Sequence, residues 1–205
     1  MIRSAIFVAI VVLIAAPSGA QNLLTNPGFD VPDQLNGWTC RTTYGTSVWS
    51  PHDHLGSPGS GSMENEVSAT SDNQSVRCSQ CVPVHQHLAY AASVWCFWPD
   101  DPDVSQQGST RISFQFYSDA DCIDVIPVGE VQSTYPTLDT WLHLVSDEVD
   151  APAGAMSAGV FVFTWQTLAN QPVRARVDDV EFSTTALFWD DFESGGLDAW
   201  SDSTP

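Results

Sequence analysis

Histidines in two closely spaced pairs are the first residues whose spacing could support chemistry. They occur as His52-Asp53-His54 and His85-Gln86-His87. On a β-strand, residues two apart face the same side at about 7 Å from each other, near enough to share one metal ion. The first pair, however, stands in a stretch rich in glycine, proline and serine (51–62), which predicts a loop. We therefore favour loop and edge histidines over a catalytic metal centre.

A carboxylate pair, Glu64 and Glu66, is the second candidate. The two side chains would share one strand face, at a separation that suits the two carboxyl groups of a glycoside hydrolase. No G-x-S-x-G element and no phosphate-binding loop occurs in the chain. A solvated strand face is the favoured interpretation, so the chain is predicted not to be an enzyme. A small secreted hydrolase or lyase acting on glycans is the least favoured alternative.

Aromatic side chains offer a different chemistry, because a flat ring can stack on the apolar face of a sugar ring. The chain has eight tryptophans, and most are expected in the core. The predicted core tryptophans are Trp38, Trp95 and Trp141. Aromatic residues at strand ends beside polar loops are the sugar-binding candidates, namely Trp49, Trp98, Trp165 and Tyr44. Gln115, Asn73 and Gln166 could bond sugar hydroxyls. Exposure of the candidate tryptophans in one groove would favour sugar binding, and their burial would favour a scaffold.

The composition excludes several partners. The chain has 205 residues, 43% of them apolar, which predicts one globular domain. It carries 25 acidic residues against 6 basic ones, all arginine, and a net charge of −19. A surface this negative repels phosphate backbones, so nucleic acid and anionic lipid are excluded as expected partners. It attracts cations and suits a calcium-rich extracellular setting.

The first twenty residues have the layout of a secretory signal peptide. Arg3 precedes an apolar run over 5–16, and small residues at Ser18 and Ala20 predict cleavage before Gln21. The run is shorter than the roughly 20 residues that span a bilayer. We expect a secreted protein with a domain over 21–185, an acidic tail over 186–205 and no membrane span after cleavage.

Five cysteines in an oxidising compartment indicate disulfides and one unpaired thiol. Cys96 and Cys122 lie near opposite ends of adjacent predicted strands and form the preferred pair. Cys40 with either Cys78 or Cys81 forms the second pair. A closed zinc site is not favoured, because only one C-x-x-C occurs.

Short β-branched and aromatic runs bounded by turn residues predict an all-β sandwich. In the run 159–165 the aromatic residues fall on one face and the smaller residues on the other. The strands are predicted near residues 23–25, 37–43, 46–50, 60–68, 74–82, 88–98, 110–117, 124–131, 140–147, 157–165 and 173–183.

Two segments together resemble a known family. The start of the mature chain, NLLTNPGFD over 22–30 followed by Gly37-Trp38, resembles the opening strand of carbohydrate-binding modules of families 4, 9 and 22. The segment ARVDDVEF over 175–182 resembles their last strand. The resemblance covers about residues 22–183 and implies a jelly-roll β-sandwich of the galactose-binding-like kind. The tail resembles a short C-terminal element of secreted bacterial proteins.

The same resemblance implies one structural calcium ion where the two segments meet. Carried over by position, the carbonyl of Gly28, the carboxylate of Asp30, and Asp178 or Asp179 would hold the ion. Alternation along a strand places Asp178 and Asp179 on opposite faces, so only one side chain is expected to reach it. Calcium prefers such oxygen ligands, and Asp53 or Glu64 could complete the shell.

These observations favour a secreted, non-catalytic carbohydrate-binding-like module with a structural calcium and a polysaccharide or glycan as its partner. The alternative is a structural or adhesive cell-surface sandwich without a sugar site. The sequence leaves the glycan and the oligomeric state open.

Overall fold

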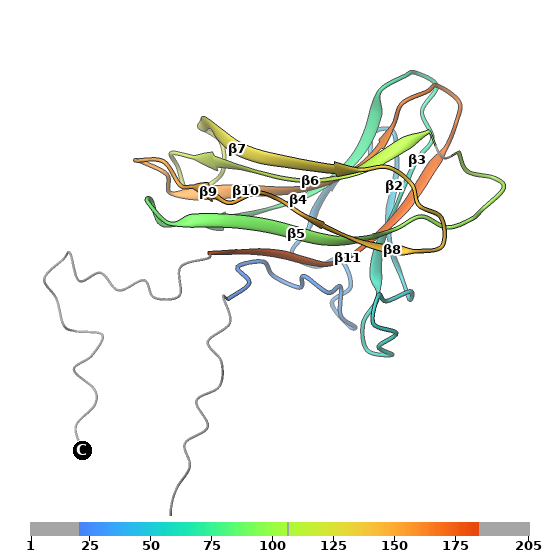
Figure 1. Ribbon diagram of the computed structural model, residues 1–205, viewed down its shortest axis with the longest axis horizontal. Helices are drawn as coiled ribbons and strands as arrows, with labels where there is room; N and C mark the ends of the chain where they lie inside the picture. The colour runs from blue at the N-terminus through green and yellow to red at the C-terminus, as the bar shows by residue number, and fades with distance from the viewer. Residues whose placement is uncertain (1–20, 106, 185–205) are drawn as a thin grey trace, which may run out of the picture.

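The structure is a computed structural model that describes residues 21–105 and 107–184 (Figure 1), and within these residues all regular structure is β-strand. Five strands form an antiparallel sheet, the five-stranded sheet, in the order β1-β4-β10-β6-β7. Their bounds are Thr39–Arg41, Gln74–Pro83, Ser157–Gln166, Gly108–Tyr117 and Val125–Thr134. The predicted signal peptide and the predicted tail lie outside the described residues. Residue 185, the last residue of the predicted domain, also lies outside them.

The second layer, the six-stranded sheet, has the order β2-β3-β11-β5-β8, with β9 also paired to β5. The bounds of β2, β3, β11, β5, β8 and β9 are Gly45–Ser50, Ser62–Val67, Val173–Thr184, Ala89–Phe97, Trp141–Val145 and Val149–Asp150. The predicted all-β two-sheet sandwich is confirmed. One predicted strand is wrong: 23–25 is irregular, although the amide of Leu23 donates to the carbonyl of Phe182 at 2.9 Å.

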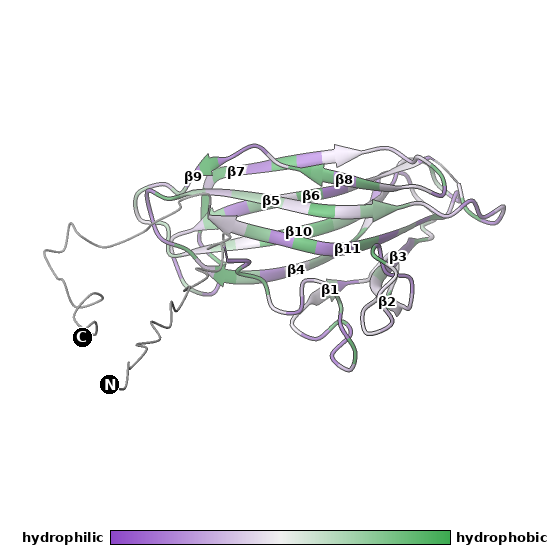
Figure 2. Cartoon of the chain, turned by 60° about the horizontal axis from the view of Figure 1, so that its bottom comes forward, coloured by the Kyte–Doolittle hydropathy of each residue, from purple (hydrophilic) through white to green (hydrophobic). Residues whose placement is uncertain are grey.

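The core lies between the two sheets and follows from the alternation of side chains along each strand. Hydrophobic and hydrophilic residues alternate along the strands in Figure 2. Phe114 of β6, Val160 of β10 and Phe182 of β11 are almost fully buried, and the rings of Phe114 and Phe182 lie 5.2 Å apart. On β10 the valines face this core, so the aromatic residues of the same strand face outward.

Disulfides join neighbouring parts of the five-stranded sheet. Cys40 of β1 bonds Cys78 of β4, which confirms one of the two alternatives for that pair. The preferred pair of Cys96 with Cys122 is wrong, because Cys122 bonds Cys81 and Cys96 is a buried free thiol. The physical reason is that β5 and β6 follow each other in the chain but belong to different sheets.

The two ends of the described chain run side by side, as the resemblance implied. The amide of Val180 donates to the carbonyl of Pro27 at 3.0 Å, and the side-chain amide of Asn22 donates to the carbonyl of Val180 at 2.8 Å. This contact brings Gly28 and Asp30 to the middle of β11. The described residues contain no helix with the length and apolarity that crossing a bilayer requires.

Candidate functional site

The outer face of the five-stranded sheet carries an aromatic strip formed by Phe161, Phe163 and Trp165 of β10. These side chains are half-buried, because they face outward from the middle strand of the sheet between neighbouring side chains. Register places Ser79 and Ser113 on either side of Phe161 and places two arginines on either side of Phe163. The strip is therefore a row of rings bordered by small and polar side chains.

Two arginines lie over these rings. The guanidinium carbon of Arg77 lies 5.1 Å from the ring centre of Phe161, and that of Arg111 lies 4.6 Å from the ring centre of Trp165. Such cation–π contacts hold a planar guanidinium flat against a ring, while its N–H groups at the edge can still donate. The face thus combines apolar stacking surfaces with fixed hydrogen-bond donors.

A groove of about 530 Å³ runs along this face beside the strip. Two glycines flank Gln115 in one row of the sheet, Gly129 on β7, which lines the groove, and Gly159 on β10. A Cβ at Gly159 would lie 2.8 Å from the ring of Phe161, and one at Gly129 would lie 2.2 Å from the carbonyl of Phe114. The two glycines therefore allow the ring of Phe161 and the backbone of β6 to approach the sheet closely.

A second hollow of about 370 Å³ continues the groove toward β1. Arg77, Tyr117 and Phe161 line both hollows. Burial raises the pKa of the Tyr117 hydroxyl, an effect that the nearby positive charge of Arg77 partly offsets. Tyr117 therefore stays a neutral donor and acceptor at physiological pH.

The predicted sugar-binding residues do not gather in one place. Trp165 and Gln115 lie on the outer face of the five-stranded sheet, as described above. Trp49 belongs to β2 of the other sheet and donates from its indole nitrogen to the carbonyl of Phe29 at 2.9 Å. Trp98 is only 2% exposed, so it cannot serve as a platform. Tyr44 is exposed just before β2, and a role in sugar binding stays a prediction for it.

The polar candidates also separate. Gln166 is fully buried and bonds the backbone of Ala69 and Leu168, which makes it a structural residue. Asn73 is exposed in a turn before β4 with a φ of 57°. The sequence reasoning missed Phe161 and Phe163. The outward arginines at 77 and 111 were the available signal, since charged residues in step with aromatic ones indicate a solvent-facing row.

The tryptophan core predictions are correct for Trp38 alone, which is 9% exposed. Trp95 and Trp141 are half-buried on the outer face of the six-stranded sheet. There the Trp95 ring lies between two imidazoles, with ring centres 4.2 Å away for His54 and 4.6 Å away for His143. The run containing Trp95 is apolar on both faces, so no pattern in it indicates which of its residues a loop covers.

A cluster of side chains that could bind a metal ion lies next to the stacked rings of His54, Trp95 and His143. One ligand atom each from His54, Asp178 and Asp179 falls within 4.8 Å of the others. The alternation rule that separated the two aspartates fails here, because a β-bulge follows Asp178 and Asp179 takes a left-handed φ of 45°. Both carboxylates therefore face the loop that carries His54.

Asp178 is fully buried and accepts hydrogen bonds from the amides of His54 and Asp179, both at 2.8 Å. Burial raises the pKa of Asp178 to about 7; these two bonds lower it, and the charges of Asp179 and Asp53 raise it further. Nδ1 of His54 lies 2.7 Å from a carboxylate oxygen of Asp179. The cluster thus holds two carboxylates at a place that disfavours negative charge.

Gly28 and Asp30 approach the same cluster. A Cβ at Gly28 would lie 3.1 Å from one carboxylate oxygen of Asp179 and 3.9 Å from one of Asp30. The carbonyl of Gly28 accepts a hydrogen bond from the hydroxyl of Ser60 at 2.6 Å. Gly28 and Asp30 therefore lie near Asp179, while the cluster within 4.8 Å among the described residues consists of His54, Asp178 and Asp179. These oxygens match the donor set that calcium prefers, whereas the imidazole of His54 does not.

The glutamates considered for catalysis lie elsewhere. Glu64 bonds Arg176 at 2.7 Å and Glu66 bonds Arg174 at 2.7 Å, on the outer face of the six-stranded sheet. Each carboxylate therefore has a structural partner, which agrees with the strand-face interpretation. Of the four histidines in the two pairs, His54 alone belongs to a potential metal cluster among the described residues.

Neither a protein-family model nor a curated protein matches this chain. Solved structures do match it. The enzymatically active domain of tailspike protein 4 from bacteriophage CBA120 matches with a TM-score of 0.59 at 14% identity, over 80% of this chain and 21% of that one. The module TmCBM61, solved with β-1,4-galactotriose, matches with a TM-score of 0.55 at 13% identity, over 80% of this chain and 99% of that one. A structure of Clostridium thermocellum xylanase 10B with CBM22-1 and GH10 modules, complexed with xylohexaose, also matches. Its TM-score is 0.52 at 14% identity, over 82% of this chain and 29% of that one.

These matches show the fold. The predicted jelly-roll β-sandwich is confirmed, and it is the fold of carbohydrate-binding modules. The chain spans about a fifth of the tailspike domain but corresponds to 99% of TmCBM61. Membership of families 4, 9 or 22 stays a prediction.

Proposed function

We propose that this protein is a secreted, non-catalytic glycan-binding module whose sugar site is the groove on the outer face of the five-stranded sheet. The observation that carries the proposal is the aromatic strip on β10, which lies half-exposed along that groove. Rings of Phe161 and Phe163 offer flat apolar surfaces, and Gln115 and Ser113 supply polar atoms beside them. Pyranose rings present the complementary pattern of an apolar face and a hydroxyl rim.

Two further observations support it. TmCBM61, which was solved in complex with β-1,4-galactotriose, shares the fold over almost its full length. The two disulfides suit an oxidising, extracellular compartment, as the predicted signal peptide does. Glu64 and Glu66 are bonded to arginines on the other sheet, which supports binding rather than hydrolysis as the activity.

The test is binding of an array of oligosaccharides, followed by calorimetry on the best ligand. We expect measurable affinity in the wild type and a loss of about tenfold or more in Phe161→Ala, because the ring supplies the stacking surface. Phe97→Ala is the matched control, since Phe97 is a half-buried aromatic residue under an arginine on the other sheet. Equal affinity in Phe161→Ala, or a wholly negative array, would contradict the proposal.

We further propose that a structural calcium ion is held by Asp30, Asp178 and Asp179, with the carbonyl of Gly28 as a further oxygen ligand. The ion would supply the positive charge that the buried Asp178 carboxylate lacks. We expect calcium to raise the melting temperature relative to chelator. The free energy of unfolding should rise by about 2.7 kcal/mol at a calcium concentration 100 times the Kd. Asp179→Asn should abolish the gain, and Asp147→Asn, a change at an exposed aspartate, should keep it.

A scaffold or adhesive protein without a sugar site is the second candidate. It is favoured by the burial of Trp98 and by the apolar side chains exposed on or near the edge strand β7, Val125, Val131 and Tyr135. An uncovered sheet edge with apolar residues can pair with another chain. A negative glycan array combined with concentration-dependent self-association would support this candidate.

A further inference from the structure

Three arginines gather on the outer face of the five-stranded sheet. Arg41 of β1 lies directly opposite Arg77 of β4, and Arg77 and Arg111 lie on either side of Phe163. The row across the sheet is therefore Arg41, Arg77, Phe163 and Arg111. Like charges placed directly opposite each other on neighbouring strands destabilise a sheet. The row carries this cost, and its compensation within the described chain comes from the cation–π contacts of Arg77 and Arg111 and not from a carboxylate.

The other two arginines of the described chain, Arg174 and Arg176, both form ion pairs with carboxylates. Arg174 lies 2.7 Å from Glu66 and 2.6 Å from Asp101, and Arg176 lies 2.7 Å from Glu64. By contrast, none of the three arginines in the row has a carboxylate oxygen of the described chain within 4.0 Å. In a chain with 25 acidic residues, pairing is the expected state of an arginine. The missing partner points to an anion that comes from outside.

The row is also held ready for a ligand. Arg77 and Arg111 are half-buried, and their guanidinium groups rest over the rings of the aromatic strip. The side-chain entropy that an arginine loses on binding is thus partly lost already. Arg77 lies where the two hollows join, so a molecule in the groove reaches it from either side.

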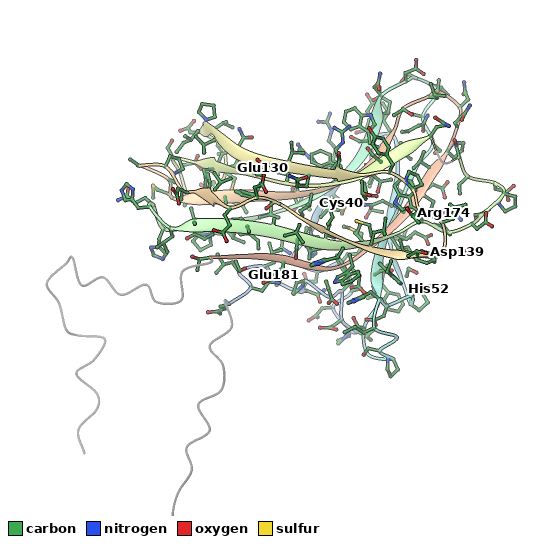
Figure 3. All side chains as sticks on the ribbon, in the orientation of Figure 1. Cys40, His52, Glu130, Asp139, Arg174 and Glu181 are labelled. Atoms are coloured by element: carbon green, nitrogen blue, oxygen red, sulfur yellow. A yellow bond between two sulfur atoms is a disulfide. The ribbon has the colours of Figure 1, made fainter. Side chains whose placement is uncertain are left out.

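An acidic residue also lines each hollow. Glu130 of β7 lines the larger hollow, and Asp121 lines the smaller one. Glu130 accepts a hydrogen bond from Gln132 at 3.2 Å. Figure 3 shows Glu130 on β7, far from Arg174, which lies near Asp139 toward the other end of the sandwich. Arg77 lines both hollows, whereas each acidic residue lines one of them, so Arg77 is the place in the groove where a negative group is favoured.

We propose that the groove binds an anionic glycan, with the acid group of one sugar residue against Arg77, which lines both hollows, and its ring on the aromatic strip. This inference rests on the proposed sugar site and specifies its ligand class. A uronic acid carboxylate and a sulfate ester share the chemistry, since arginine donates two parallel hydrogen bonds to either. Arg41, exposed at the edge, extends the row toward a second acid group.

The experiment compares matched pairs of oligosaccharides. The array holds uronate oligosaccharides beside their carboxyl-reduced forms and sulfated oligosaccharides beside their desulfated forms, on several backbones. We expect at least one acidic member to bind about 10- to 100-fold more tightly than its neutral partner, as a charge-assisted bidentate contact implies. Preference for the carboxylate pairs identifies a uronate ligand, and preference for the sulfate pairs identifies a sulfated one.

Variants then locate the preference. Arg77→Gln should lower the affinity for the acidic form more than the affinity for the neutral form, so that most of the acid preference is lost. Arg176→Gln, which removes a paired arginine over Phe97 on the other sheet, should leave the preference unchanged. Equal binding of acidic and neutral forms in every pair would overturn this inference and leave the proposed sugar site standing. A negative array throughout would overturn both.

Discussion

The two outer faces of the sandwich use the same residue types in opposite ways. On the six-stranded sheet, Arg176 lies over Phe97 and is also bonded to Glu64. On the five-stranded sheet, Arg77 lies over Phe161 without a carboxylate partner in the described chain. An arginine over an aromatic ring is thus a neutralised structural unit on one face and a charged, donor-rich unit on the other.

Negative charge shows the reverse pattern. The six-stranded face adds a carboxylate pair, Asp178 and Asp179, which within the described residues contacts the imidazole of His54 and no arginine. Each face therefore has a local charge imbalance of opposite sign, one suited to an anion and the other to a cation. The hydrogen bonds that Arg174 donates to Glu66 raise the pKa of Arg174, which shows how strongly this arginine is held by its partner. Function is expected where pairing is incomplete.

The largest expected effect tests the carboxylate side of this comparison. The folded protein keeps a proton on Asp178 up to about pH 7, whereas the unfolded chain releases it near pH 4. In chelator, the free energy of unfolding should therefore fall as the pH rises from about 4 to 7, by roughly 2 to 4 kcal/mol. Urea unfolding at a series of pH values measures it. Asp178→Asn should flatten this slope, and an unchanged slope in that variant would contradict the assignment.

Charge reversal tests the arginine side. Arg77→Glu should weaken binding of an anionic oligosaccharide by about 100-fold or more, because a carboxylate then replaces a donor in the groove. The corresponding change on the other face, Arg176→Glu, places two carboxylates together at Glu64 and should lower the melting temperature without a comparable loss of affinity. If both variants lose affinity equally, the two faces do not differ in the way described. Calorimetry and thermal melts separate the two outcomes.

Ring removal sharpens the same contrast. Phe163→Ala should reduce affinity for neutral and acidic oligosaccharides by similar factors of about tenfold, since stacking does not depend on the acid group. It also loosens the support under Arg77, whose guanidinium carbon lies 6.0 Å from that ring centre. A loss confined to acidic ligands would mean that the ring only positions the arginine.

The smallest effect concerns the paired arginines. Glu64→Gln removes a partly exposed ion pair and should lower the free energy of unfolding by only about 0.5 to 1 kcal/mol. Binding of any glycan should be unaffected, because Glu64 lies on the opposite sheet. A loss of activity toward a glycan substrate in this variant would instead revive the hydrolase alternative.

Strand positions were predictable because alternation is a local property. The predicted strand near 157–165 corresponds to β10 at Ser157–Gln166, and the predicted strand near 110–117 corresponds to β6 at Gly108–Tyr117. It was harder to predict which residues of each strand face the core and which face outward. Aromatic residues at 161 and 163 face outward because the valines between them fill the core, and Trp95 faces outward under a loop that carries His54.

The cysteine pairing and the metal cluster depended on features that a linear pattern does not contain. Cys122 reaches Cys81 because β6 and β4 lie in one sheet with β10 between them. Asp178 and Asp179 converge because a bulge breaks the alternation that the sequence implied. Both depend on strand order and local register, which are set by the packing of the whole domain.

The sequence by itself determined an acidic, all-β chain with turn-bounded strands, since composition and alternation act residue by residue. It also determined that the chain as a whole repels anions. The tertiary structure alone decided that Arg41, Arg77 and Arg111, from three different strands, stand in one row beside a groove. The physical reason is that net charge sums over the whole surface, whereas a binding site depends on the few charges that strand order brings together.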